Sequence, residues 1–423
     1  METSWKRNLA LFLVSQTLSL FGSSLVQYAI LWYIVLETRS GVIMTVYIVC
    51  GFVPAFILSP FAGVWADRYD RRKIIMLSDA LIALVTLALA LVFLSGHRAL
   101  WLLIAAAAVR AVGTALQQPA VGAFIPQIVP EERLMRVNGI NGTIQSAIML
   151  ASPAVSGLLM SLTPLYTLFF VDVVTAALAI SIILFLLRVP PHAKALEKQD
   201  IGYLADMRLG FAYIQQHRYL VTFFMYMAIL MFLITPAAFL TPLQVARTYG
   251  TEVWRLTAIE MLFSGGMMLG GGLISVWGGL PNRIKTMLLS HAIMAACTVG
   301  LGLMFPFWLY LTVMAVFGVA LPFFNTPATV LIQEHVEPDF LGRVFSILVM
   351  INTAIMPLGM LIFGPLAEVV SIEWILIATG AALIVMAGLM PLNKRLLAAG
   401  APKQPSASDH SMGSAVPASA GDQ

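Results

Sequence analysis

Long apolar runs separated by short polar segments dominate the chain. A helix needs about 20 apolar residues to cross the hydrocarbon core of a bilayer, and these runs reach that length. We expect twelve spans, six before and six after a polar stretch from Arg188 to Arg218. The predicted spans are 9–35, 42–65, 74–95, 99–121, 138–161, 164–187, 219–244, 254–277, 286–304, 307–331, 343–369 and 373–392. The pattern therefore predicts an all-α membrane protein.

The pattern also divides the chain into four parts. We expect an N-terminal six-helix half over residues 1–188, a cytoplasmic linker over 189–218 and a C-terminal six-helix half over 219–393. Residues 394–423 are rich in Ala, Ser, Pro and Gly, and this composition is typical of a disordered tail. The first apolar run is too long for the core of a signal peptide, so we interpret it as a retained first helix.

Two pairs of segments repeat weakly and occupy corresponding loops of the two halves. The segment QPAVGAFIPQIVPEERLMRV from Gln118 aligns with TPATVLIQEHVEPDFLGRV from Thr326. The segment VWADRYDRRK from Val64 aligns with VWGGLPNRIK from Val276. Many transporters are built from two parallel halves related by an axis along the membrane normal, with the substrate site between them near the midplane. We therefore expect two pseudo-symmetric halves.

Composition agrees with a membrane location. Hydrophobic residues make up 60% of the chain and charged residues only 10%, whereas soluble proteins carry roughly 25% charged residues. Both cysteines, Cys50 and Cys297, lie in apolar runs, where free cysteines are usually small buried hydrophobes. Neither a disulfide framework nor a metal site is indicated. The basic residues occupy short loops, which argues against nucleic-acid binding.

Loop charges predict the orientation. Of the 24 lysines and arginines, 19 fall in the predicted loops on the side of the N-terminus and one, Arg110, falls inside a span. The four on the other side are Arg39, Arg98, Arg247 and Arg255. Cytoplasmic loops carry the excess of Lys and Arg. We therefore expect a multi-pass protein of the cytoplasmic (inner) membrane with both termini in the cytoplasm.

The loop after the second span carries the most specific motif. Its members are Gly63, Asp67, Arg68, Asp70, Arg71, Arg72 and Lys73. A glycine at a helix end allows two backbones to approach closely. A carboxylate at this surface could accept hydrogen bonds from a helix N-terminus and pair with an arginine. A basic loop that only fixes topology is the alternative, but it does not explain Gly63 and Asp67.

This motif resembles Gly-x-x-x-Asp-Arg-x-x-Arg-Arg/Lys, the signature of the major facilitator superfamily. The resemblance implies a loop that locks the second span against the eleventh when the transporter faces outward. Asp67 would then meet the helix that begins near Gly342, with Arg71 or Arg343 alongside. Gly279 stands where the second half would carry the equivalent of Asp67, so we expect an asymmetric lock.

The chain resembles, more narrowly, the macrolide-efflux group of the drug:proton antiporters. The matching stretches are DRYDRRKIIMLSDALI from Asp67, RAVGTALQQPAV from Arg110 and PFFNTPATVLIQEHVEPDFLGRVFS from Pro322. Two departures concern the antiporter signatures. In the fourth span, Gly113 follows Arg110 by three residues, whereas the family signature has a spacing of four. In the fifth span, only Ser152, Pro153 and Gly157 match the glycine-rich signature.

Ionisable residues inside spans are candidates for function, because each costs roughly 2.5–3.5 kcal/mol to insert at a helix centre. The candidates for proton coupling are Glu260, Asp172, Asp79 and Arg110. Arg110 lies near mid-span and should face a cavity and a carboxylate. Asp172 in the same half could be this partner, or could instead pack against Asn141 or Gln145.

Glu260 is our preferred proton carrier. It lies far from any basic loop and precedes a glycine-rich run. A carboxyl group that moves between water and a dry cavity can bind and release a proton. Asp79 is expected either to neutralise the basic loop or to act in gating, and His291 to be a satisfied polar residue.

The resemblance further implies a substrate cavity between the halves. Its candidate lining residues are Tyr28, Trp32, Phe232, Phe323, Phe324 and Asn325. We expect a proton-coupled exporter of amphiphilic small molecules that works as a monomer, without cofactor or metal. Export or facilitated passage of a siderophore or lysophospholipid is the alternative. A membrane enzyme or a non-transporting scaffold is more remote, because the sequence has no nucleophile elbow, Walker loop or metal-ligand spacing.

Overall fold

The computed structural model describes residues 2–187, 189, 203–392, 397 and 400. The described residues form helices and no strand. The α-helices are α1 (Glu2–Thr38), α2 (Gly41–Arg68), α3 (Arg71–Leu94), α4 (Leu100–Ile128), α5 (Leu134–Leu162), α6 (Leu165–Ser181), α7 (Tyr203–Gln216), α8 (Arg218–Phe239), α9 (Thr241–Thr248), α10 (Val253–Trp277), α11 (Arg283–Gly302), α12 (Phe307–His335), α13 (Pro338–Val369) and α14 (Ile372–Leu389).

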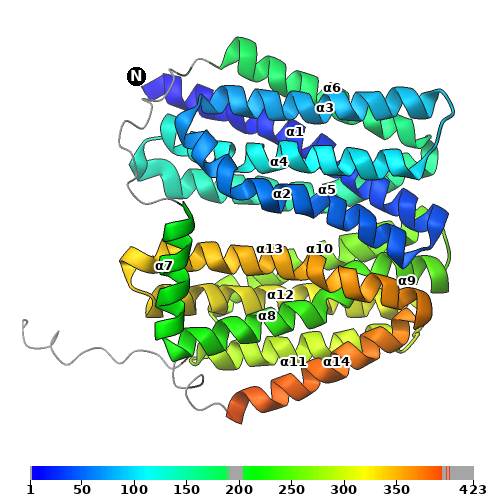
Figure 1. Cartoon of the computed structure of the whole chain (residues 1–423), viewed down its shortest axis with the longest axis vertical. Helices are drawn as coiled ribbons and strands as arrows, with labels where there is room; N and C mark the ends of the chain where they lie inside the picture. The colour runs from blue at the N-terminus through cyan, green and yellow to red at the C-terminus, as the bar shows by residue number, and fades with distance from the viewer. Residues whose placement is uncertain (1, 188, 190–202, 393–396, 398–399, 401–423) are drawn as a thin grey trace, which may run out of the picture.

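Twelve of the described segments are long and apolar enough to cross a membrane, which confirms the number of spans expected from the sequence. Helices α1 to α6 form the first half, and α8 to α14 form the second. Helices α8 and α9 follow one another as a single span, Arg218–Thr248. The two halves lie one above the other in Figure 1, with their helices running in the same general direction.

Polar side chains cap the starts of α2 and α3. The first amide groups of a helix have no intrahelical acceptor. The Ser40 hydroxyl accepts a hydrogen bond from the Ile43 amide at 3.3 Å, and the Asp70 carboxylate accepts one from the Arg72 amide at 3.0 Å. These caps fix where α2 and α3 begin.

The predicted linker contains a helix that the apolar runs did not reveal. Helix α7 crosses one end of the bundle, nearly perpendicular to the other helices (Figure 1). Its Tyr213 ring stacks on Phe340 of α13 at 4.3 Å, and the Tyr213 hydroxyl accepts a hydrogen bond from the Glu337 amide at 3.2 Å. Helix α7 is therefore attached to the second half. Except for residues 397 and 400, the predicted tail 394–423 lies outside the described residues.

The two ends of the bundle differ in how closely the halves approach. We call the end with the start of α1 and the α2–α3 loop the basic face, and the end with the α1–α2 turn the distal face. At the distal face, a Cβ atom added to Gly364 of α13 would overlap the Thr45 hydroxyl of α2. One added to Gly157 of α5 would likewise overlap the Thr257 hydroxyl of α10. Both seams between the halves are therefore closed there.

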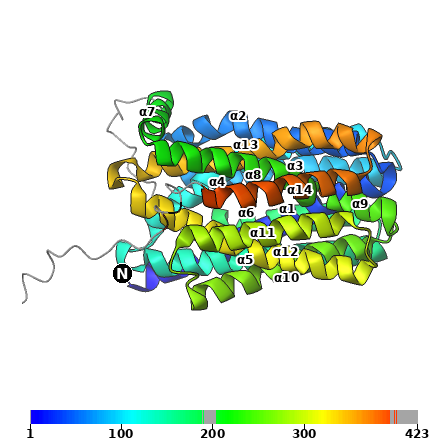
Figure 2. The same cartoon turned by 90° about the horizontal axis from the view of Figure 1, so that it is seen from below.

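The same helices are free of such contacts near the basic face. A Cβ atom at Gly63 of α2 or Gly342 of α13 would meet nothing within 4 Å. The same is true of Gly139 in α5 and Gly272 in α10. Figure 2 shows the same bundle seen from below, with α7 at the end that carries the N-terminus. The bundle is thus closed at the distal face and open toward the basic face.

Candidate functional site

A central cavity with two lobes occupies the space between the halves. One lobe has a volume of about 910 Å³ and the other of about 1100 Å³. Residues of both halves line each lobe. The lobes share Gln27, Leu31, Gln118 and Phe239 as lining residues. They are therefore neighbouring parts of one cavity.

Carboxamide side chains line much of the first lobe, which we call the amide lobe. They come from α1, α4 and α5 of the first half: Gln16, Gln27, Gln117, Gln118, Asn141 and Gln145. The second half contributes apolar residues, Ala238, Phe239 and Pro242, together with Glu260. One wall of the lobe can thus form many hydrogen bonds while the facing wall is mainly apolar. This combination suits an amphiphilic ligand.

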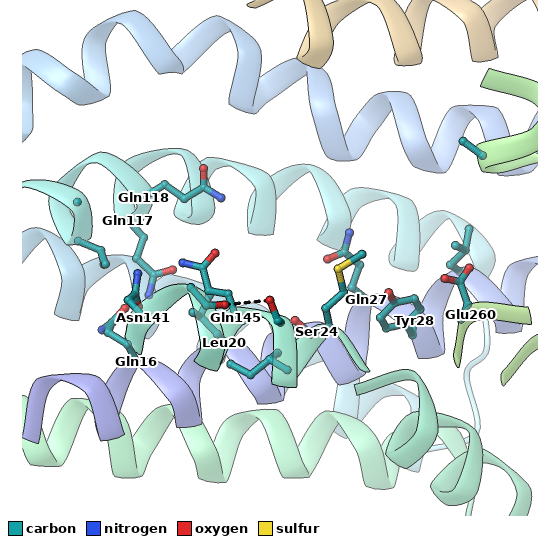
Figure 3. Close-up of a pocket in the computed structure, with 18 of the residues that line it drawn as sticks. Gln16, Leu20, Ser24, Gln27, Tyr28, Gln117, Gln118, Asn141, Gln145 and Glu260 are labelled. Carbon is teal, nitrogen blue, oxygen red and sulfur yellow. Dashed lines mark hydrogen bonds between the residues drawn. The ribbon is translucent and has the colours of Figure 1, made fainter. Parts of the chain in front are cut away.

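Glu260 is the only charged residue among those that line the amide lobe. It lies on α10 beside Tyr28 at one end of the lobe, with Gln16 and Asn141 toward the other end (Figure 3). No described residue forms a hydrogen bond or ion pair with Glu260. Its carboxyl group is therefore available to a proton or to a ligand.

The second lobe contains Arg110, so we call it the arginine lobe. Arg110 Nη1 lies 2.6 Å from Asp172 Oδ2, which brings together the two residues that the sequence suggested as partners. The Asp172 carboxylate also accepts hydrogen bonds from Thr86 Oγ1 at 3.0 Å and Ser23 Oγ at 3.3 Å. Arg110 Nη2 donates to the Ser23 carbonyl oxygen at 3.2 Å. Asp172 is fully buried, and this pair adds no net charge to the cavity.

Asp79 lies in a buried polar cluster of the first half. Its Oδ1 accepts hydrogen bonds from Ser19 Oγ and from Gln117 Nε2, both at 2.6 Å. Its Oδ2 has no hydrogen-bond partner among the described residues. No basic residue belongs to this cluster, so the structure does not pair Asp79 with the basic loop. Gln117 links the cluster to the amide lobe.

The arginines of the loop motif bind helix ends within the first half. Arg71 donates to the carbonyl oxygens of Ala66 at 3.0 Å and Ala123 at 2.9 Å. Arg72 donates to those of Ile183 and Leu184 at 2.6 and 2.7 Å. These carbonyl groups lie near the end of α2 (Ala66), in α4 (Ala123) and in the π-helical segment Ile182–Leu186 that follows α6, so the two arginines tie the loop to three parts of the first half.

The two glycines of the proposed lock, Gly63 of α2 and Gly342 of α13, make no close contact across the halves. Gly63 and Gly342 face open space, Arg68 is exposed, and the Arg343 guanidinium lies 5.3 Å from the Phe340 ring of its own helix. The side chain of Asp67 lies outside the described residues. The predicted contact of Asp67 with the start of α13 stays a prediction.

Of the six proposed cavity residues, only Tyr28 lines one of the two lobes. Phe232 packs on Phe363 with ring centres 5.1 Å apart, and Phe323 packs on Trp277 at 5.8 Å. Trp32 and Phe324 are buried, and Asn325 is exposed away from the lobes. The four aromatic side chains among these five residues are buried or pack against other rings, and Asn325 faces outward.

The amides were missed by the sequence interpretation although a signal was present. Gln16, Leu20, Ser24, Gln27 and Leu31 all line the amide lobe. Their spacing of three or four residues places them on one face of α1. Uncharged amides within a long apolar run, repeated at helical spacing, indicate a polar cavity.

A family model described as Major Facilitator Superfamily matches residues 12–360. The chain belongs to the major facilitator superfamily. It is 30% identical to Macrolide efflux protein A of Streptococcus pyogenes over 393 residues, which cover 92% of this chain and 96% of that protein. It is 32% identical to Macrolide efflux protein A of Enterococcus faecalis over 314 residues, 73% of this chain and 96% of that protein. The family expected from the loop motif is thus confirmed.

Solved transporters share the fold at low sequence identity. A nucleoside transporter superposes with a TM-score of 0.71 at 14% identity, covering 92% of this chain and 100% of its own. A bacterial homologue of the lysosomal transporter Spinster, solved facing inward, has a TM-score of 0.64 at 16% identity, covering 96% of this chain and 100% of its own. These likenesses show that the chain shares its fold with solved transporters.

Proposed function

We propose that the chain exports amphiphilic small molecules, macrolide-like drugs among them, in exchange for protons. The observation that carries this proposal is the amide lobe, with one hydrogen-bonding wall, one apolar wall and a single charged residue, Glu260. A large amphiphile needs both kinds of wall. The macrolide efflux relatives, which match over most of the chain, support the same substrate class.

Alternating access is the mechanism that fits a cavity between two halves. The excess of Lys and Arg in the loops of the basic face supports a cytoplasmic location for that face. The distal seams are closed and the cavity lies toward the basic face, so the conformation corresponds to an inward-facing state. Rocking of the halves would then expose the cavity to the outside. Both lobes lie within one chain, which supports function as a monomer.

Glu260 is our candidate for the coupling residue. It has no ion-pair partner among the described residues, and rocking would expose it in turn to each side of the membrane. Proton binding at this carboxyl would favour one conformation, and substrate binding would favour the other. Arg110 and Asp172 neutralise each other and Asp79 lines neither lobe, so Glu260 is the carboxyl without an ion pair that the cavity itself presents.

The test is drug susceptibility in an efflux-deficient host, with and without a protonophore, for the wild type and Glu260→Gln. We expect the wild type to raise the inhibitory concentration of a macrolide and the protonophore to abolish this protection. Glu260→Gln resembles the protonated form, so it should stop net efflux at normal abundance while substrate exchange in proteoliposomes remains measurable.

The matched control is Glu252→Gln, which removes an exposed carboxylate beside Arg255 on the distal face, away from the cavity. It should protect the host as the wild type does. Proton-driven efflux that persists in Glu260→Gln would move the coupling role to Asp172 or Asp79. Protection that is indifferent to the protonophore would refute proton antiport itself.

A further inference from the structure

The distal face carries a cluster of charged contacts that crosses from one half to the other. Arg247 of α9 and Glu368 of α13 belong to the second half, and their side chains meet at 3.2 Å. The groups that they bind across the seam lie in the turn between α1 and α2, in the first half. These contacts across the seam can therefore form only while the distal face is closed.

Glu368 binds the start of α2. Its Oε1 accepts hydrogen bonds from the Ser40 hydroxyl at 2.7 Å and from the Val42 amide at 3.3 Å. The amides of a first helical turn lack intrahelical acceptors, and a carboxylate is stabilised by the positive end of the helix dipole. One half thus supplies an acceptor that the first turn of a helix in the other half lacks.

Arg247 binds the turn that precedes α2. Its Nε and Nη2 donate to the Arg39 carbonyl oxygen at 3.0 and 2.6 Å, while its Nη1 donates to the Ala367 carbonyl oxygen at 2.5 Å. Arg39 has a φ of 48°, in the left-handed region that a residue with a side chain seldom adopts. The guanidinium therefore joins the α1–α2 turn to the end of α13.

A close helix contact lies directly beneath these polar groups. Thr45 Oγ1 donates to the Met360 carbonyl oxygen at 3.2 Å, and Gly41 of α2 opposes Gly364 of α13. The glycines allow the backbones to approach, so opening the distal face must break the polar contacts and this seam together.

We propose that Glu368 and Arg247 form a latch that holds the distal face closed and must release before the cavity opens on that side. This proposal rests on the alternating access of the proposed function. Glu368 is the residue before the last in α13, as Asp67 is in α2. The same helix pair would therefore be latched at one end by Glu368 on the start of α2, and at the other end by Asp67 on the start of α13.

The test measures how far the distal face is open, without any substrate. Spin labels at His97 and Ser371, exposed positions in distal loops of the two halves, report the separation by pulsed electron resonance in nanodiscs. Cys50 and Cys297 are replaced beforehand so that only the introduced cysteines react. Glu368→Ala should raise the ratio of long to short distances roughly tenfold, because it removes charge-assisted bonds to a helix start.

The matched control is Glu252→Ala on the same face. Glu252 pairs at 2.9 Å with Arg255 of its own half, so its loss should leave the distance distribution unchanged. Ser40→Ala should shift the ratio less than Glu368→Ala does, and combining the two should add little, since they remove one shared contact. If Glu368→Ala folds poorly, Arg247→Gln serves as the second latch variant and should shift the ratio in the same direction.

Distances that stay at the wild-type value in both Glu368→Ala and Arg247→Gln would overturn the latch. A shift of equal size in Glu252→Ala would overturn it as well, because the effect would then reflect surface charge alone. The distance measurement does not depend on export. If the latch variants shift the distances as expected but the wild type does not protect the host from the drug, the proposed substrate class is refuted and the latch is not.

Discussion

At the residue scale, the Arg110–Asp172 pair shows which charges the membrane tolerates. Both groups are buried, and each is satisfied by the other together with Thr86 and Ser23. Such a pair adds little net stability, but removal of one partner leaves an uncompensated buried charge. The pair is therefore a sensitive place to alter the protein, and the consequence differs from that expected at Glu260.

Asp172→Asn should lower the abundance of the folded protein. It leaves the Arg110 guanidinium buried without its counter-charge, a loss of about 3–5 kcal/mol. Abundance in the membrane and the melting temperature after extraction measure the effect. The double variant Arg110→Gln/Asp172→Asn should recover part of it, because no lone charge remains.

Asp79→Asn is the matched control for this prediction. Asp79 is equally buried, but its partners are the neutral groups of Ser19 and Gln117. An amide oxygen can still accept both hydrogen bonds, so abundance should stay near the wild type. Equal losses for the two variants would mean that burial of the carboxylate, and not its ion pair, decides folding.

Charged and uncharged site residues differed in how well the sequence revealed them. Arg110 and Asp172 could be singled out because charges inside spans are rare, and the structure does place them together. The amides Gln16 and Gln117 were overlooked, and Asn141 was considered only as a partner of Asp172, because a carboxamide in an apolar run is unremarkable by itself. The choice of Phe232 and Phe323 placed too much weight on aromatic side chains, which pack between helices in most spans.

At the element scale, α2 and α13 form the seam on which both proposed latches act. They touch at the distal end through Gly41 and Gly364, whereas Gly63 and Gly342 at the other end face open space. A helix pair that closes at one end while it opens at the other matches the rocking of two rigid halves. The glycines at both ends are consistent with close approach in each of the two states.

Asp67→Asn should slow transport without reducing expression. A single charge-assisted contact at a helix start contributes up to about 2 kcal/mol, enough to shift the balance of conformations but not to unfold the chain. Transport rate in proteoliposomes is the measurement. Asp70→Asn in the same loop is the control, because Asp70 caps its own helix α3 and asparagine caps equally well. Normal transport by Asp67→Asn would mean that the loop fixes the membrane topology and has no role in gating.

Elements were predicted from the sequence to different degrees. The spans were recognisable because hydrocarbon requires long apolar helices whose backbone groups are satisfied internally. Helix α7 was missed because it is short and its apolar residues do not form a long run: Gly210, Tyr213 and Ile214 are buried, whereas Leu209 and Phe211 are exposed. A short amphipathic helix of this kind is stabilised by its docking surface, which local sequence does not display.

At the scale of the whole molecule, pseudo-symmetry and loop charge could be read from the sequence, but the conformational state could not. The repeats around Gln118 and Thr326 indicate two related halves in any state. Which face is closed depends on small free-energy differences between two packings of the same helices. Those differences arise from cross-half contacts, such as Glu368 with Ser40, between residues that are 328 positions apart in the chain.

The last prediction concerns the orientation of the whole molecule in the membrane, that is, which of its loops face the cytoplasm. Reporter fusions at Gly96 and Thr248 should read outside, and fusions at Lys194 and Lys403 should read inside. The physical reason is that 19 of the 24 basic residues lie in loops on one side, and such loops are retained in the cytoplasm. Alkaline phosphatase is active only when exported and green fluorescent protein only when retained, so the two reporters check each other at every site. If Lys194 alone reads outside, the expected span count of the first half is wrong. If Lys194 and Lys403 both read outside, the orientation is reversed and the inward-facing assignment of the cavity reverses with it. The six candidate spans before Lys194 predict that it lies on the same side as the N-terminus, because an even number of crossings returns the chain to the side on which it started.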